Sequence, residues 1–152
     1  MLQQSARSFL AISAVLFLLT GMGLASDHES LNGTWVLVPA RSQFAGEPMM
    51  QTGTVTISDR EHHIYISRNY NFDGQNVTVN YQTSMDGKEN SSIHEGKTFK
   101  TKGKWEGREL VVTSIQDDVV STERYRLNSN GTMMLTVDRP GHRTIVLFFE
   151  RQ

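Results

Sequence analysis

The sequence contains no cysteine, and this absence excludes several kinds of chemistry at once. Without thiols the chain has no disulfide bond, no thiolate metal site, no cysteine nucleophile and no lipid-modified N-terminal cysteine. The sequence also lacks an excess of either sign of charge, because basic and acidic residues nearly balance and leave a net charge of -1 at pH 7. This balance argues against nucleic acid or an anionic membrane surface as a partner.

Long apolar runs are scarce as well, and the one pronounced run lies near the N-terminus, at residues 9–19. It is followed by small residues at positions 23 and 25, three and one residues before a cut at Ser26, a pattern that predicts a signal peptide over residues 1–25. The run is shorter than the roughly 20 residues that a spanning helix needs, so we expect no transmembrane anchor, although an uncleaved N-terminal anchor is the alternative. We therefore expect an exported protein, periplasmic or secreted, with one domain at residues 26–152. Export without disulfides is commoner in bacteria, so we expect a bacterial source.

What the chain does contain, from Gly33 onward, is a series of short segments in which apolar and polar residues alternate. Turn signals such as Asp73-Gly74 separate them, and most connections have hairpin length. The exception is Pro39 to Gln51, which we expect to be a long loop with at most one helical turn. The expected strands cover about residues 33–38, 52–58, 62–72, 77–85, 91–93, 99–105, 108–115, 119–127, 133–137 and 144–150.

This order predicts an all-β fold, an antiparallel up-and-down meander that closes into a barrel of about eight to ten strands. Closure removes exposed sheet edges, which an open meander of this length would leave unpaired. A sandwich is less compatible with the sequence because it would show long crossing connections instead of successive hairpins.

Two short motifs at the ends of the predicted domain carry a resemblance to a known family. Gly33-Thr34-Trp35 opens the first strand, and Arg151 follows two phenylalanines and a glutamate at the end of the last. This arrangement resembles the lipocalin and fatty-acid-binding-protein group of barrels, and most of all small exported bacterial lipocalin-like proteins. The resemblance covers most of residues 31–151. It implies that Trp35 plugs the closed end of the barrel, that Arg151 packs across its ring, and that a ligand enters from the other end.

A candidate binding pair lies on the third predicted strand, where Arg68 and Tyr70 share a face with Ile64 and Ile66. Side chains two residues apart point the same way, so both are expected to face the barrel interior. There, a guanidinium and a hydroxyl would hold a carboxylate by charge-assisted hydrogen bonds. Fatty-acid-binding proteins use an Arg-x-Tyr pair in this way, but on the last strand. The alternative is that both residues face water near the Asp73-Gly74 hairpin.

The function that we expect is non-catalytic binding of a small apolar or amphipathic molecule inside the barrel, without a cofactor. The chain has no G-x-S-x-G elbow and no phosphate-cradling glycine loop, so we do not expect an enzyme. The expected ligand-binding residues are Arg68, Tyr70, Tyr81, Phe99 and Tyr125, with Ile66 and Leu147 also on the inward face.

Two other functions stay open from the sequence. The first is a cell-envelope interaction or structural module with a filled barrel, which would expose apolar residues on its outer face. The candidates for that face are Val36, Val38, Val111, Val146 and Phe148. The second is a periplasmic metal-binding protein that uses His94 and His142 with His62 or His63. Because His62 and His63 are expected to be adjacent on a strand, their rings would point to opposite faces, and surface histidines are the preferred interpretation.

Overall fold

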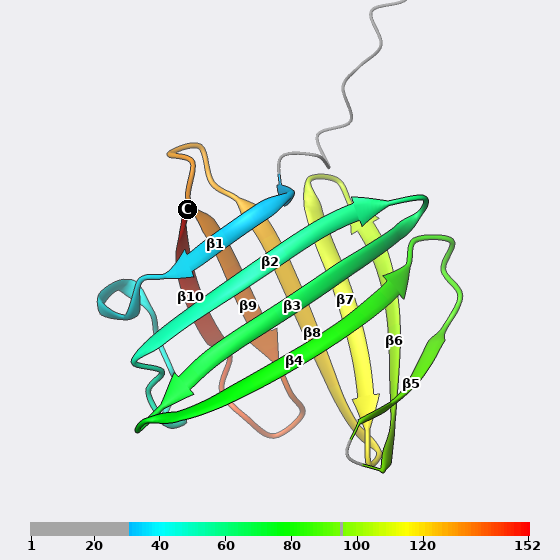
Figure 1. The fold of residues 1–152 in the computed structure, drawn as a ribbon, viewed down its shortest axis with the longest axis horizontal. Helices are drawn as coiled ribbons and strands as arrows, with labels where there is room; N and C mark the ends of the chain where they lie inside the picture. Colours follow the sequence, from blue (N-terminus) through cyan, green and yellow to red (C-terminus); the bar gives the residue numbers. More distant parts are fainter. Residues whose placement is uncertain (1–30, 95) are drawn as a thin grey trace, which may run out of the picture.

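The structure is a computed structural model that describes residues 31–94 and 96–152. The predicted signal peptide, residues 1–25, lies outside the described residues. Ten strands form one antiparallel sheet in the described part, with the order β4-β3-β2-β1-β10-β9-β8-β7-β6-β5 (Figure 1). The strands are β1 (Gly33–Leu37), β2 (Thr52–Arg60), β3 (His63–Phe72), β4 (Gln75–Ser84), β5 (Asn90–His94), β6 (Lys97–Glu106), β7 (Glu109–Gln116), β8 (Val119–Leu127), β9 (Met133–Asp138) and β10 (Ile145–Arg151). The prediction of an up-and-down all-β barrel is confirmed.

Tight hairpins with a left-handed backbone join several of these strands. Asp73 and Gly74 have φ values of 47° and 82°, and Glu61 and His62 have values of 50° and 69°. Two positive φ values in a two-residue loop match the right-handed twist of the flanking strands. The sequence predicted the first of these turns, but the expected strand start at His62 is wrong. His62 lies in the turn and β3 begins at His63, so the two histidines are not adjacent strand residues.

The barrel closes in two different ways on its two sides. The first and last strands pair directly, with Trp35 opposite Arg151. On the other side β4 and β5 end the sheet order, and β4 instead packs against β6. Thr101 Oγ1 donates a hydrogen bond to the carbonyl of Gln82 at 2.7 Å. Gly103 permits this approach, since a Cβ there would lie 2.7 Å from Thr83. Side chains therefore close the seam where the backbone ladder is missing.

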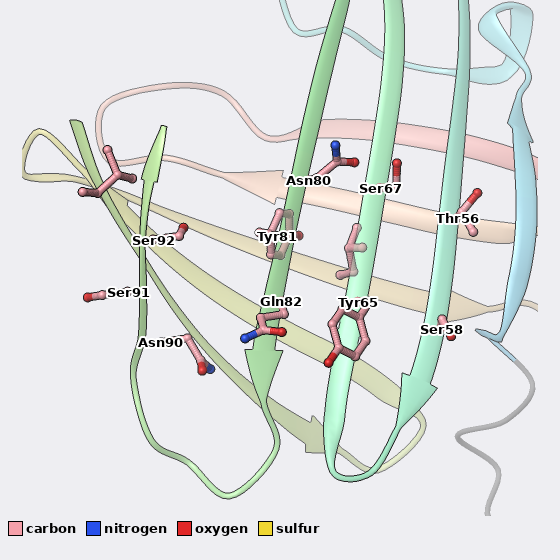
Figure 2. Close-up of a pocket in the computed structure, with 12 residues that line it drawn as sticks. Thr56, Ser58, Tyr65, Ser67, Asn80, Tyr81, Gln82, Asn90, Ser91 and Ser92 are labelled. Carbon is pink, nitrogen blue, oxygen red and sulfur yellow. The ribbon is translucent and has the colours of Figure 1, made fainter. Parts of the chain in front are cut away.

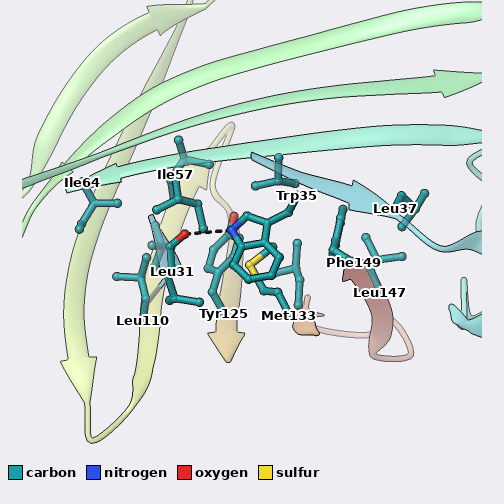
Figure 3. Close-up of a cluster of buried hydrophobic side chains, with 14 of the residues drawn as sticks. Leu31, Trp35, Leu37, Ile57, Ile64, Leu110, Tyr125, Met133, Leu147 and Phe149 are labelled. Atoms are coloured by element: carbon teal, nitrogen blue, oxygen red, sulfur yellow. Dashed lines mark hydrogen bonds between the residues drawn. The ribbon is translucent and has the colours of Figure 1, made fainter. Parts of the chain in front are cut away.

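Apolar side chains fill the end of the barrel near Trp35 (Figure 3). Trp35 is fully buried, and its Nε1 donates to the carbonyl oxygen of Leu31 at 2.9 Å. The Arg151 guanidinium carbon lies 4.3 Å from the Trp35 ring centroid, while Arg151 Nη1 donates to the carbonyl of Asn32. Trp35 and Arg151 therefore contact each other at this end of the barrel. The opposite end carries a single 3-10 turn, η2 (Pro39–Arg41), and the loop that follows it.

Candidate functional site

A polar cluster lies inside the apolar barrel, and we call its four members, Arg68, Tyr81, Glu123 and Tyr125, the Arg68 cluster. They come from inward positions of β3, β4 and β8. Arg68 Nη1 donates to Glu123 Oε1 at 2.5 Å. The hydroxyls of Tyr81 and Tyr125 donate to Glu123 Oε2 at 2.6 and 2.7 Å. The side chains of Arg68 and Glu123 are only 12% and 6% exposed, so this is a buried ion pair with both carboxylate oxygens in use.

The protonation of the Arg68 cluster follows from burial and from the carboxylate at its centre. Burial disfavours a charged guanidinium, but the attraction of Glu123 and of the neighbouring tyrosines outweighs it and raises the pKa of Arg68 well above its ordinary value. Burial, and then the charge of Glu123, raises the pKa of Tyr81 and of Tyr125 well above 10. Both phenols are therefore neutral donors at physiological pH, and the only formal charges in the cluster belong to the ion pair.

Two buried polar atoms beside the cluster have no hydrogen-bond partner among the described residues: Arg68 Nε and Tyr70 Oη. Tyr70 is 8% exposed, and burial raises its pKa to about 12 although the Arg68 charge acts against that rise. A buried polar group without a partner costs about 1–3 kcal/mol, so native proteins place water or a ligand group against it. The two atoms mark a position where a small polar group would be stabilised.

The open end of the barrel, opposite Trp35, holds two pockets that share Arg139 in their walls. The first has a volume of about 470 Å³ and is lined by Phe44, Glu47, Pro48, Met50, Phe72, Gln75, Val77, Arg139 and Ile145. The second has a volume of about 400 Å³ and is lined by Lys97, Phe99, Ser114, Gln116, Asp117, Val119, Ser121 and Arg139. Arg139 Nη2 lies 2.9 Å from Glu47 Oε1, so an ion pair ties the loop after η2 to the loop before β10. We call this end the mouth.

The Arg68 cluster lies deeper in the barrel than the mouth, on strands that also reach the mouth, β3 and β8. Phe72 lines the first pocket four residues along β3 from Arg68, and Ser121 lines the second two residues along β8 from Glu123. At about 3.3 Å per residue, the cluster is roughly 7–13 Å deeper than these mouth residues. Neither mouth pocket has Arg68 in its wall.

A third pocket, of about 510 Å³, lies against the outer face of β2, β3 and β4, with β5 along one side (Figure 2). Most of its lining side chains alternate with core residues along their strands and therefore point away from the interior. They are mainly serine, threonine, asparagine and glutamine, with the exposed Tyr65 and Ile93. We call it the outer groove. The residue types differ from those of the first mouth pocket, whose wall includes Phe44, Met50, Phe72 and Ile145.

The structure brings together most of the residues that the sequence analysis selected. Tyr70, Tyr81 and Tyr125 are buried with Arg68, and the Phe99 ring packs edge-on against Tyr81 with centroids 5.7 Å apart. Ile66 and Leu147 are also buried. The alternative in which Arg68 and Tyr70 face water is wrong, because both project into the barrel.

Glu123 is the residue that the sequence analysis missed. A signal for it was present, since Glu123 is the only charged residue on the face that Val119, Ser121 and Tyr125 share along β8. An isolated acid among inward residues needs a buried cation, and Arg68 was the available one. With Glu123 in place, the guanidinium that was expected to hold a ligand carboxylate already holds one from the protein.

The residues expected on an exposed apolar surface are partly covered. Val111 is 2% exposed and lies in register between Lys104 and Arg124, whose long side chains can cover it. The Arg41 guanidinium lies 5.1 Å from the Phe148 ring centroid. Val36 remains exposed at 39%. Val111 is therefore buried, and the outer apolar surface is interrupted at that position.

For the metal hypothesis, His63 Nδ1 lies 3.2 Å from the carbonyl oxygen of Glu61, in the turn between β2 and β3. His142 Nδ1 lies 3.5 Å from Glu47 Oε1 at the mouth. Within residues 31–94 and 96–152, no three histidine or acidic side chains are grouped so that they could hold a metal ion. Within the same residues no helix has the length and apolar character needed to cross a membrane.

Comparisons with known proteins give structural likenesses only. No family model matches the chain, and no curated protein matches it in sequence. Secretory abundant heat soluble protein 4 from Ramazzottius varieornatus superposes with a TM-score of 0.63 at 15% identity, over 82% of this chain and 96% of that one. A protein described as REP1-NXSQ fatty acid transporter gives a TM-score of 0.61 at 18% identity, over 80% and 96%. The Schistosoma mansoni fatty acid binding protein in complex with arachidonic acid gives 0.58 at 15% identity, over 83% and 98%. At such identities the likeness establishes the fold, which is a nearly closed barrel of the lipocalin and fatty-acid-binding-protein type.

Proposed function

We propose that this protein binds a small apolar or amphipathic molecule inside its barrel and has no catalytic role. The observation that carries the proposal is the pair of buried donors, Arg68 Nε and Tyr70 Oη, that lack a partner among the described residues. Two structural neighbours support it, since one is described as a fatty acid transporter and another is in complex with arachidonic acid.

The route that we propose for the ligand passes through the mouth. Phe44, Met50, Phe72 and Ile145 give the first mouth pocket apolar walls. Each methylene group that leaves water for such walls contributes about 0.8 kcal/mol, so an alkyl chain of moderate length binds measurably. Arg139, which pairs with Glu47, lines both mouth pockets, and we expect the opening of this pair to widen the entrance.

The test is displacement of an uncharged fluorescent apolar probe, Nile red, from the purified protein by a panel of lipids and aromatic compounds. Compounds that displace the probe are expected to raise the melting temperature, because a ligand that binds only the folded state stabilises it. A panel in which no compound displaces the probe or shifts the melting temperature would overturn the proposal.

Two variants locate the binding position. Phe72→Glu places a charge in the wall of the mouth and is expected to weaken displacement by at least tenfold, with circular dichroism verifying that the barrel still folds. Tyr65→Ser changes the outer groove by a comparable loss of aromatic surface and is expected to leave binding unchanged. A loss of binding in Tyr65→Ser alone would mean that the ligand lies outside the barrel, contrary to the proposal.

The proposed setting is outside the cytoplasm of a bacterial cell. The support is the pattern of residues 1–25, a short apolar run followed by small residues. N-terminal sequencing of the protein from its producing cells is expected to begin at Ser26. Protein that retains Met1 in the cytoplasmic fraction would contradict export.

A further inference from the structure

The charge of Arg68 is already balanced inside the barrel. Its Nη1 is 2.5 Å from Glu123 Oε1, and the hydroxyls of Tyr81 and Tyr125 bond the other carboxylate oxygen. A ligand carboxylate that approached Arg68 would therefore also approach Glu123. Two carboxylates near one guanidinium repel each other strongly, since a buried site screens charge poorly.

The interior next to Arg68 still has hydrogen-bond donors available to a ligand, although its charges are already paired. Arg68 Nε and Tyr70 Oη are both buried and without a partner in the described part of the chain. Arg68 and Tyr70 are two residues apart on β3 and so project to the same side of the sheet. Tyr70 is the nearer of the two to Phe72 and hence to the mouth. An oxygen acceptor that passed inward along β3 from the mouth would reach Tyr70 before Arg68.

The cations at the mouth are balanced in the same way. Arg139 pairs with Glu47 at 2.9 Å, and Lys97 Nζ pairs with Asp117 at 2.6 Å. Ser114, Gln116 and Ser121, which line the second pocket, are polar but uncharged. Arg139 and Lys97, the basic residues in the walls of the two mouth pockets, thus each have an acidic partner.

We propose that the barrel selects ligands whose polar head is an uncharged oxygen acceptor, an alcohol, ester or amide, over those that end in a carboxylate. The inference rests on the proposed function, because it assigns the head-group chemistry of the same interior site. The apolar tail occupies the space toward the mouth, while the head accepts from Tyr70 and Arg68. Glu123 is the specificity-determining residue because it neutralises the one buried guanidinium of the site.

The experiment uses ligands that share a twelve-carbon chain and differ only in the head: dodecanol, methyl dodecanoate, dodecanamide, dodecanoic acid and, without a head, dodecane. Nile red displacement from the wild-type protein at pH 7.4 is expected to require at least tenfold less of each uncharged polar compound than of the acid. Tyr70→Phe is expected to weaken the three uncharged polar compounds about three- to tenfold and to leave dodecane unchanged. Tyr65→Phe, which removes a hydroxyl from the outer groove, serves as the matched control.

Glu123→Gln tests the cause of the preference. It keeps the size of the side chain but removes its charge, so Arg68 becomes free to pair with a ligand. Dodecanoic acid is then expected to bind at least tenfold more tightly than dodecanol. If this variant does not fold, the comparison of head groups on the wild-type protein decides by itself.

The outcomes separate the two proposals. If no compound binds, the proposed function fails and this inference fails with it. If the compounds bind but the acid equals or exceeds the alcohol in the wild-type protein, the proposed function stands and the head-group inference is overturned. Equal binding of dodecane and dodecanol, with no effect of Tyr70→Phe, overturns it in the same way.

Discussion

The buried ion pair between Arg68 and Glu123 allows a quantitative prediction through Arg68→Met, Glu123→Leu and the double variant. The two side chains are 12% and 6% exposed, so solvent does not screen the charge that either single variant leaves behind. Removing one partner of a buried pair costs about 3–5 kcal/mol. We expect Glu123→Leu at the upper end of this range, because it leaves a buried cation and also deprives Tyr81 and Tyr125 of their shared acceptor. Arg68→Met belongs near the lower end, since Glu123 keeps both phenol donors.

The double variant is the critical measurement. Replacing both charges by apolar groups of similar volume is often neutral or stabilising. Here the change also loses the contact of Arg68 with the Tyr81 ring, whose centroid is 5.1 Å from the guanidinium carbon. That contact is worth about 0.5–2 kcal/mol. Loss of the Glu123 acceptor leaves Tyr81 and Tyr125 with only each other as hydrogen-bond partners, at 3.1 Å, and costs about 1–3 kcal/mol more. We therefore expect the double variant to be about 1.5–5 kcal/mol less stable than the wild type, well short of the two single losses added together. The coupling free energy is then about 3 kcal/mol or more in favour of the intact pair.

Urea denaturation followed by tryptophan fluorescence and circular dichroism measures these free energies of unfolding. For a domain of this size each kcal/mol also shifts the melting temperature by roughly 3–5 °C, which provides an independent check. Single variants that each change the free energy of unfolding by less than about 1 kcal/mol, the range of exposed pairs, would refute the buried geometry. A double variant as unstable as the two single variants added together would refute the reasoning about paired charges.

Three further predictions concern stability. Gly103→Ala puts a Cβ 2.7 Å from Thr83 at the seam between β4 and β6. It is expected to lower the free energy of unfolding, measured by urea denaturation, by about 1–3 kcal/mol. Adding Thr83→Ala should restore part of this loss, and an unchanged stability of Gly103→Ala would show that β4 and β6 are loosely packed. Arg151→Ala removes a cation 4.3 Å from the Trp35 ring and is expected to cost about 0.5–1 kcal/mol, whereas an unchanged stability would contradict a role for this contact. The pKa of Tyr70, raised to about 12 from 10, contributes stability that is complete below pH 10 and is lost as the pH rises through 12. Tyr70→Phe should therefore lose less stability between pH 9 and 12 than the wild type, and equal losses would contradict the raised pKa.

Much of the fold follows from local features of the chain. Alternation of apolar and polar residues specifies which side chains share a face, and turn residues such as Asp73-Gly74 specify where hairpins form. That is why the strands, their antiparallel order and the inward direction of Arg68 and Tyr70 were predictable. The turn at Glu61 and His62 was not, because glutamate does not favour a positive φ, and the pairing of β2 with β3 imposes it.

The partner of Arg68 could not be predicted from local sequence features, because tertiary structure brings it into contact. Glu123 is 55 residues away, on a strand that is not adjacent to β3 in the sheet. The two meet only across the interior, because pairing of β1 with β10 curls the sheet until its faces oppose each other. The curvature of the sheet and the offset between its strands depend on every strand of the barrel, so no short segment of the sequence determines them. The periodicity of the chain thus determined which residues enter the barrel. Only the closed tertiary structure decided that the carboxylate of Glu123 would neutralise the guanidinium of Arg68.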